Sequence, residues 1–238
     1  MFNRKTEIRR AVKLSDTKEQ VLKWLWKPYI PLGKITVVHG IHGVGKSIFM
    51  ARLAAVCTGS GKIGGINLEE KYNVLYFTAD DDLSEILRPR LVEAGANLEY
   101  IYAVHDMLPF TLGDDSVEQM IEEHQIKIMI VDPIQEYMGH DVYQAPPEDT
   151  YPIILKLADI ANKYGCAVIL VAYSDGPNGE KSMLWQEFTE KISSIICIER
   201  KDEDFKDCLL MHEKCLLAPE GGQLEFRLDC STIKQKHE

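Results

Sequence analysis

The sequence predicts an α/β domain whose central sheet is mainly parallel, is flanked by helices and is extended at its C-terminal end by antiparallel strands. From Lys34 to Tyr173, short β-branched runs alternate with helical stretches. These runs are apolar on both faces, which is typical of parallel strands that helices cover on each side. After residue 190 the alternation gives way to strands joined by turns, which indicates antiparallel pairing.

The elements can be placed in order along the chain. We expect strands at residues 34–40, 73–79, 100–104, 126–132 and 166–173, and helices at about 45–58, 83–94, 116–124 and 149–164. Beyond them, 194–200 and 208–217 around the charged turn 201–207 predict a β-hairpin, and 223–228 predicts one more strand. We expect one large domain over residues 24–230, between a basic N-terminal arm at 1–23 and a flexible tail at 231–238.

The chain of 238 residues carries a formal net charge of −10, which argues against broad coating of nucleic acid or of an anionic membrane. The charge is uneven, because residues 1–30 hold eight Lys and Arg against three acidic side chains. No stretch approaches the roughly 18 apolar residues of a membrane helix. A polar run follows the basic N-terminus where a signal peptide would be apolar, so we expect a cytoplasmic protein without a membrane partner.

Six cysteines are scattered along the chain without a CxxC pair, and several fall inside apolar runs. They predict reduced, mostly buried thiols. Neither these cysteines nor the seven histidines show the close spacing of a structural zinc site, so the sequence predicts no such site.

Residues 40–47, GIHGVGKS, match the phosphate-binding pattern G-x-x-x-x-G-K-[ST] without a mismatch. The motif begins where an apolar strand ends and runs into a helix, so backbone N–H groups and the helix N-terminus converge on phosphate oxygens. Lys46 is expected to reach the β- and γ-phosphates, and the Ser47 hydroxyl to ligate Mg²⁺. The expected nucleotide-binding residues are Gly40, His42, Gly43, Val44, Gly45, Lys46, Ser47 and Ile48.

A second pairing of glycine and lysine lies at residues 59–62, GSGK. It follows a helix rather than a strand, so we interpret it as a helix C-cap and loop. The first motif also has an alternative interpretation, as a glycine-rich turn with an exposed lysine, which its position between a strand and a helix disfavours.

Two acidic features follow predicted strands. Asp132 closes 126–132 and is expected to hold Mg²⁺ through water, the alternative being an acid that begins a turn. In the run of three aspartates at 80–82, Asp82 and Glu85 together predict a helix N-cap. Asp80 is predicted to orient an attacking water as general base, the alternative being a solvated turn acid. Lys46, Asp80 and Asp132 form the expected catalytic set.

Five segments carry a resemblance to a known family: 24–47, 74–91, 128–139, 165–175 and 214–229. They span most of the chain and resemble RecA-like P-loop ATPases, in the AAA-family ATPase group similar to hexameric replicative helicases of the RepA type. The resemblance implies a RecA-like fold that binds ATP and Mg²⁺ between the subunits of a homo-oligomer, such as a hexamer. It further implies hydrolysis that serves DNA replication, recombination or repair, with single-stranded DNA or a replication protein as partner.

The chain departs from this family pattern at positions that speed hydrolysis. Relatives carry a catalytic Glu where this chain has Asp80. In the γ-phosphate sensor region, where relatives have a His followed by Asn-Lys, this chain has Tyr173, Asp175 and Gly176. No arginine stands near Ser193, and Lys214 keeps only the lysine of a K-x-R pair that reaches across subunits, since Leu216 replaces the arginine. Because a trans arginine is worth about 10³–10⁵ in rate, we expect slow or conditional turnover.

Three cations could substitute for the missing arginine as contacts to a neighbouring subunit: Lys191, Lys214 and Arg200. The alternative for each is a solvated charge at a strand end or in a hairpin. For Lys191 and Arg200 we favour that alternative.

The loops expected to meet DNA in this fold, residues 139–149 and 174–183, hold Lys181 as their only Lys or Arg. A groove that follows single-stranded DNA needs several cations and aromatic platforms. Two functions therefore stay open. One is an ATPase motor or loader that acts on DNA, and the other is a nucleotide-gated binding protein with little turnover and no direct motor activity.

Overall fold

The computed structural model describes residues 12–19, 21–60, 62–64, 66, 68, 70–79, 81–104, 110–139, 147–174, 190–201, 206–228 and 232–234. The strands are β1 (Trp24–Trp26), β2 (Ile30–Pro31), β3 (Ile35–Gly40), β4 (Lys62–Ile63), β5 (Asn73–Thr78), β6 (Ile101–Val104), β7 (Ile126–Asp132), β8 (Ala167–Tyr173), β9 (Ile192–Arg200), β10 (Asp207–Cys215), β11 (Leu224–Arg227) and β12 (Thr232–Lys234). The α-helices are α1 (Lys46–Cys57), α2 (Arg88–Glu93), α3 (Asp115–Glu123) and α4 (Pro147–Tyr164). Short helical turns are η1 (Leu14–Asp16), η2 (Leu83–Leu87), η3 (Leu98–Tyr100) and η4 (Ile134–Tyr137).

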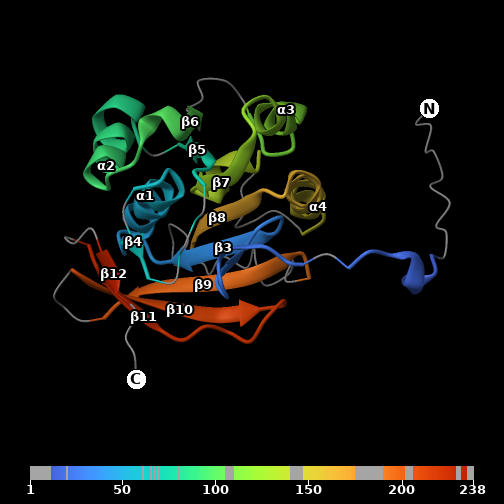
Figure 1. Cartoon of the computed structure of the whole chain (residues 1–238). Helices are drawn as coiled ribbons and strands as arrows, with labels where there is room; N and C mark the ends of the chain where they lie inside the picture. The colour runs from blue at the N-terminus through green and yellow to red at the C-terminus, as the bar shows by residue number, and fades with distance from the viewer. Residues whose placement is uncertain are drawn as a thin grey trace.

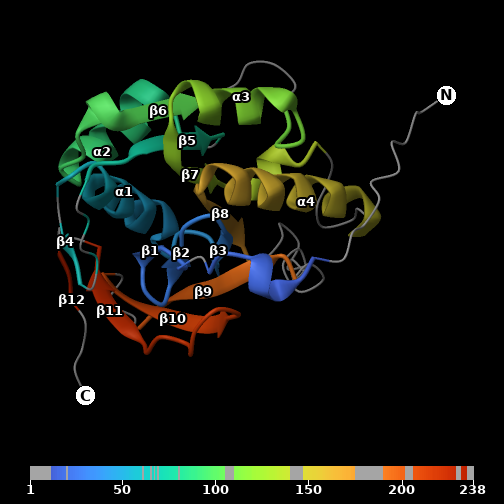
Figure 2. The same ribbon diagram turned by 45° about the vertical axis from the view of Figure 1, so that its right-hand side comes forward.

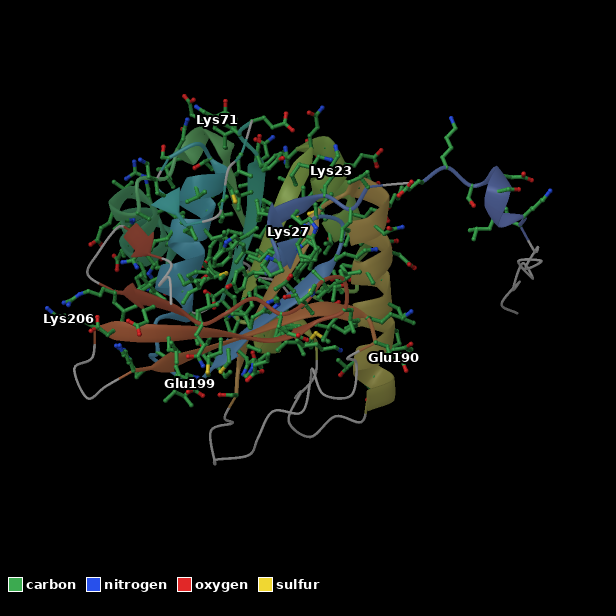
Figure 3. The ribbon with its side chains drawn as sticks, turned by 60° about the horizontal axis from the view of Figure 1, so that its bottom comes forward. Lys23, Lys27, Lys71, Glu190, Glu199 and Lys206 are labelled. Carbon is green, nitrogen blue, oxygen red and sulfur yellow. The ribbon has the colours of Figure 1, made fainter. Side chains whose placement is uncertain are left out.

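Ten strands form one sheet in the order β4-β12-β11-β10-β9-β3-β8-β7-β5-β6 (Figure 1). From β9 through β6 every neighbouring pair is parallel. From β9 through β12 the neighbours are antiparallel. The predicted fold class is therefore confirmed. Figure 3 shows Glu190 and Glu199 toward opposite ends of β9, the strand at which the two parts of the sheet join.

Helices cover the parallel part of the sheet on both faces (Figure 2). One apolar core lies between the sheet and α1 with α2, and a second lies between the sheet and α3 with α4. Successive residues of β3 alternate between them, so that Val38 packs in the first core and Val37 in the second. This double burial explains why the parallel strands are apolar on both faces.

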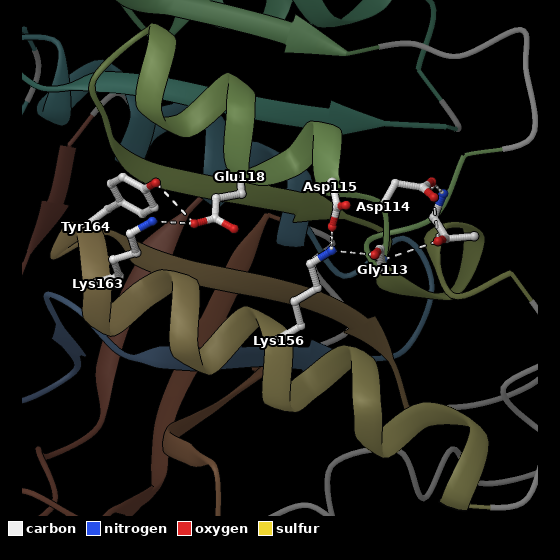
Figure 4. A network of polar contacts seen from close by, with 8 residues as sticks. Gly113, Asp114, Asp115, Glu118, Lys156, Lys163 and Tyr164 are labelled. Carbon is white, nitrogen blue, oxygen red and sulfur yellow. Dashed lines mark hydrogen bonds and ion pairs between the residues drawn. The ribbon is translucent and has the colours of Figure 1, made fainter. Parts of the chain in front are cut away.

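Polar contacts join α3 to α4 on the outer surface (Figure 4). Lys156 donates to Asp115 at 2.6 Å, and Lys163 donates to Glu118 at 2.8 Å. These hydrogen bonds lower the pKa of both carboxyl groups. Since each pair has one exposed partner, Asp115 in the first and Lys163 in the second, the contacts contribute little to the stability of the fold.

The antiparallel extension reaches further than the sequence indicated. Within the expected flexible tail, Thr232–Lys234 forms β12, which pairs with β11 on one side and with β4 on the other. Neither β4 nor β12 was predicted from the sequence. Both strands are short and lie at the edge of the sheet, where a strand forms by backbone pairing with its neighbour more than by its side-chain pattern. Of the expected basic arm, residues 1–11 lie outside the described residues, and η1 is exposed.

The two ends of α1 follow the predicted signals. Gly45 precedes the helix in a left-handed conformation with φ 104°. After the helix, Gly59 has φ 89°, its N–H donates to the Val56 carbonyl, and the Ser60 N–H donates to the Ala55 carbonyl. This pair of bonds is a Schellman C-cap, which confirms the interpretation of Gly59, whereas Lys62, expected in a loop, begins β4.

The segment before β3 packs against the sheet and does not form a separate unit. Trp26 is buried and its Nε1–H donates to the Gly64 carbonyl at 3.0 Å. The Tyr29 hydroxyl donates to the Gly222 carbonyl at 2.9 Å, which connects this segment to the loop between β10 and β11. Among the described residues, none of the helices combines the length and the apolar character needed to cross a membrane.

Arg52 connects α1 to the antiparallel extension by hydrogen bonds, and its replacement measures how much these bonds stabilise the fold. Arg52 is 6% exposed, and its guanidinium donates to the Arg227 and Leu228 carbonyls, both at 2.6 Å. We expect Arg52→Met to lower the free energy of unfolding by about 2–3 kcal/mol, because both carbonyls lose a charged donor. Urea denaturation measures this loss. Arg88→Met, at an exposed position, is the control, and an equal effect of both variants would contradict the role of Arg52.

Candidate functional site

The candidate site lies at one edge of the sheet, where parallel strands end side by side. β3 ends at Gly40, β8 ends at Tyr173 and β7 ends at Asp132. β8 pairs with β3 on one side and with β7 on the other. The carboxyl ends of parallel strands are the usual place for ligand binding in such sheets. Gly40 leads directly into the glycine-rich loop and α1.

The loop glycines stand where a side chain would not fit or where the backbone conformation disfavours one. A Cβ on Gly40 would lie 2.3 Å from the Ile198 carbonyl oxygen, and a Cβ on Gly45 would lie 2.4 Å from Leu228 Cδ2. Gly43 faces open space and has φ 70°. The loop is therefore packed closely against the sheet on its inner side, while its outer side is open to a ligand.

The N-terminus of α1 is suited to an anion. Gly45, the N-cap, offers no side-chain oxygen to the first N–H groups, and the first turn contains no acidic residue. These N–H groups and the helix dipole therefore favour a negative ligand at this end. A nucleotide phosphate fits this arrangement.

Lys46 lies in the opening of the loop. Its side chain is nearly buried, and Nζ donates to the Gly40 carbonyl at 2.7 Å and to the Ile41 carbonyl at 2.8 Å. The same Nζ lies 4.5 Å from the centre of the Tyr173 ring, on which the His42 ring stacks at 3.5 Å. A cation is thus fixed beside the helix N-terminus, where phosphate oxygens would meet it.

Ser47 in the first turn of α1 contacts Asp132 at the end of β7. Asp132 is 6% exposed and accepts hydrogen bonds from the Ser47 hydroxyl and, at 3.1 Å, from the Tyr76 hydroxyl. Burial raises the pKa of Asp132 above its usual range, while the two hydroxyls act against that rise. A hydroxyl and a carboxylate, both hard oxygen donors, are the ligands that a partly hydrated Mg²⁺ takes. The residues present therefore fit a Mg²⁺ ion between α1 and β7.

Arg200 contacts the loop of its own chain. It ends β9, next to β3, and its Nη2 donates to the Gly43 carbonyl at 2.5 Å. The interpretation of Arg200 as a solvated strand-end charge was wrong, because the parallel pairing of β9 with β3 brings the end of β9 to the loop. Tyr76 is a second residue that sequence reasoning missed, since only the pairing of β5 with β7 places its hydroxyl at Asp132.

The remaining predicted residues fall in several places. Asp80 and most of the two loops expected to meet DNA lie outside the described residues. Asp82 caps η2 as predicted, accepting from the N–H groups of Ser84 and Glu85, both at 2.8 Å. Its neighbour Asp81 forms an ion pair with Arg90.

Lys191 and Lys214 lie away from the loop of their own chain. Lys191 precedes β9 at the end opposite Arg200, and Lys214 pairs with Ile195 near that same end. Burial lowers the pKa of Lys214. Their contact with a neighbouring subunit stays a prediction.

A cavity of about 500 Å³ adjoins the loop between α1 and the η2–α2 segment. Its lining residues include Ile48 and Arg52 from α1 and Ile86, Pro89 and Arg90 from the facing segment. Ile48 follows Ser47 directly, so the cavity begins one residue beyond the phosphate-binding pattern. Its size lies within the range of small-molecule sites.

Asp132→Asn tests whether the buried carboxylate is kept for function at a cost in stability. The pKa of Asp132 is raised in the folded state above the ordinary value of 3.8. As the pH rises above 3.8, the unfolded chain therefore loses this proton more readily than the folded chain does, and the free energy of unfolding falls. At neutral pH and without Mg²⁺ or nucleotide, we expect the variant to gain about 1 kcal/mol in the free energy of unfolding. Urea denaturation measures this gain. Asp115→Asn, at an exposed site that has a lowered pKa, is the control and should show no gain; an Asp132→Asn variant less stable than the parent would contradict the argument.

Comparison with known proteins agrees with this geometry. The sequence profile of the AAA domain family matches residues 3–175, well over half of the chain, and this range contains the glycine-rich loop, Lys46, Ser47 and Asp132. A search of curated proteins finds no match. The chain therefore belongs to the AAA domain family of P-loop ATPases.

Proposed function

We propose that this protein binds ATP with Mg²⁺ at residues 40–48 and hydrolyses it slowly or only under particular conditions. The observation that carries the proposal is the meeting of Lys46, Ser47 and Asp132 at the N-terminus of α1. In this proposal Lys46 binds the β- and γ-phosphates, while Ser47 and Asp132 hold the ion, Asp132 through water. When bound, Mg²⁺ offsets the negative charge of the phosphates.

The cavity between α1 and η2–α2 is the proposed place for the nucleoside. It begins at Ile48, beside the phosphate-binding loop. Its lining combines apolar residues, such as Ile86 and Pro89, with four charged ones, Arg52, Glu85, Arg90 and Glu93. Apolar walls with a few polar groups are typical of sites for planar heterocycles. The choice of ATP among nucleotides rests on the family.

Slow turnover is proposed from the residues around the loop. Tyr173 ends β8 between the loop and Asp132, so an aromatic ring occupies a place where a polar side chain would detect the γ-phosphate. Arg200 donates to the Gly43 carbonyl of its own chain, so it does not serve as the arginine that a neighbouring subunit would supply in trans. Asp80, with its short carboxylate, remains the proposed general base.

For the cellular role we propose a helicase- or loader-like function in DNA replication, recombination or repair. This rests on the resemblance to RecA-like ATPases of the RepA type. The proposal includes a homo-oligomer, such as a hexamer, in which Lys191 and Lys214 contact the nucleotide of a neighbouring subunit. Single-stranded DNA or a replication protein is the proposed partner, and the cytoplasm the proposed compartment.

A second candidate is a nucleotide-gated binding protein with little turnover. The position of Tyr173 favours it, because its ring lies beside Lys46 and stacks on His42 in the region where the resemblance implies a γ-phosphate sensor. Such a protein would use the bound nucleotide to change its affinity for a partner. It shares the ATP site with the first candidate and differs only in turnover and in action on DNA.

Lys46→Ala tests nucleotide binding. We expect the affinity for Mg·ATP, measured by isothermal titration calorimetry, to fall by about 100-fold, because a nearly buried cation no longer meets the phosphates. Lys62→Ala is the matched control, since Lys62 belongs to the second Gly-Lys pair and is exposed. Equal affinity of parent and Lys46→Ala protein would reject the proposed site.

Turnover with and without single-stranded DNA separates the two candidates. A motor or loader should hydrolyse ATP faster with DNA and form a ring with a non-hydrolysable analogue, as measured by mass in solution. In that case Asp80→Asn should abolish turnover while leaving ATP affinity nearly unchanged. Tight ATP binding without turnover or DNA affinity would reject the motor and favour the nucleotide-gated protein.

A further inference from the structure

Three side chains with metal-binding atoms meet beside the glycine-rich loop, on three neighbouring strands. They are His39 of β3, Cys197 of β9 and Glu213 of β10. One donor atom from each lies within 4.8 Å of the other two, and His39 Nε2 lies 2.7 Å from Glu213 Oε2. His39 directly precedes Gly40, the first residue of the loop.

The register of the sheet creates this cluster. His39 pairs with Cys197 across β3 and β9, so their side chains project to the same face, as do those of Val37 and Ile195 two residues earlier. On β10 the pairing with β9 is irregular between His212 and Lys214. Met211 pairs with Cys197, so Glu213, two residues further on and inside this irregularity, lies on the same face, and its carboxylate contacts His39.

The environment of the cluster is half closed. His39 is 8% exposed and Cys197 is 5% exposed, whereas the Glu213 side chain is 43% exposed. Glu199 adds a second carboxylate near the thiol, with its Oε1 3.8 Å from Cys197 Sγ. The buried sheet thus fixes the ligand atoms of His39 and Cys197, whereas the side of the cluster at Glu213 is open to a water or an additional ligand.

We propose that His39, Cys197 and Glu213 bind one divalent transition-metal ion of the Zn²⁺ type. Imidazole nitrogen, thiolate sulfur and carboxylate oxygen are all ligands of Zn²⁺, and three protein ligands plus water complete its tetrahedral shell. Donor atoms around one tetrahedral zinc are roughly 3–4 Å apart, so small side-chain rotations bring this set to coordination distance. The thiolate makes the site soft enough to prefer such an ion over Mg²⁺.

The charge around Cys197 is consistent with a cation. The carboxylates of Glu213 and Glu199 both lie near its Sγ. A divalent cation would offset their negative charge, and the ion would replace the thiol proton. The site lies apart from Ser47 and Asp132, and its existence does not depend on nucleotide binding.

Titration of the full chain with Co²⁺, in excess Mg²⁺, tests the site. The expected result is one Co²⁺ per chain with a thiolate-to-cobalt charge-transfer band, which Zn²⁺ removes by competition and which Mg²⁺ does not affect. Cys197→Ser should abolish the band, while Cys215→Ser, a cysteine on β10 outside the cluster, should keep it. Glu213→Gln, at a partly exposed position that tolerates the change, should weaken Co²⁺ binding by about tenfold or more.

Two results would overturn the assignment. One is the lack of a charge-transfer band in the parent protein, which would leave His39 and Glu213 as a simple hydrogen-bonded pair. The other is a band that persists in Cys197→Ser or an affinity that does not change in Glu213→Gln, either of which would place the bound ion elsewhere. Circular dichroism of each variant verifies that the fold is retained.

Discussion

The parallel pairing of β9, β3, β8 and β7 is the constraint on which the site depends. It brings four strand ends to one edge of the sheet, so that Gly40, Tyr173, Asp132 and Arg200 stand near each other although they span 160 positions between Gly40 and Arg200. A slip of one residue in any of these pairs would turn the side chains of that strand to the other face. Burial in two apolar cores specifies the register strongly, because Val37 and Val38 must each enter the correct core.

The site concentrates groups that a stable fold would avoid. Lys46 and Asp132 are both nearly buried, and each is surrounded by polar partners that only partly replace water. The loop also holds glycines in conformations that other residues disfavour. Such local conflicts are expected where a protein is selected for binding an anion and a cation at one place. The stability that the cores supply makes these conflicts tolerable.

Local signals in the sequence predicted much of this structure. The apolar runs placed the parallel strands to within one or two residues, the motif at 40–47 placed the loop, and Asp82 and Gly59 were identified as helix caps from their neighbours alone. What the sequence did not reveal depends on pairing between distant segments. β12 forms only because β4 and β11 offer edges to it, and Arg200 reaches the loop only through the register of β9. The cluster of His39, Cys197 and Glu213 is of the same kind, since no spacing along the chain connects three residues from three strands.

The segment at Arg227 and Leu228 couples the position of the antiparallel strands to that of α1 and the glycine-rich loop. Arg52 donates hydrogen bonds to the carbonyls of both residues, and the Leu228 side chain fills the space that a Cβ on Gly45 would need. The helix that follows the glycine-rich loop is therefore in contact with this segment at its N-cap, Gly45, and again near its middle, at Arg52. A rigid helix transmits displacement along its axis, so a shift of this segment would move the loop with it. The outer strands thus help to fix the position of the loop and of α1, even though they lie several strands away from Asp132.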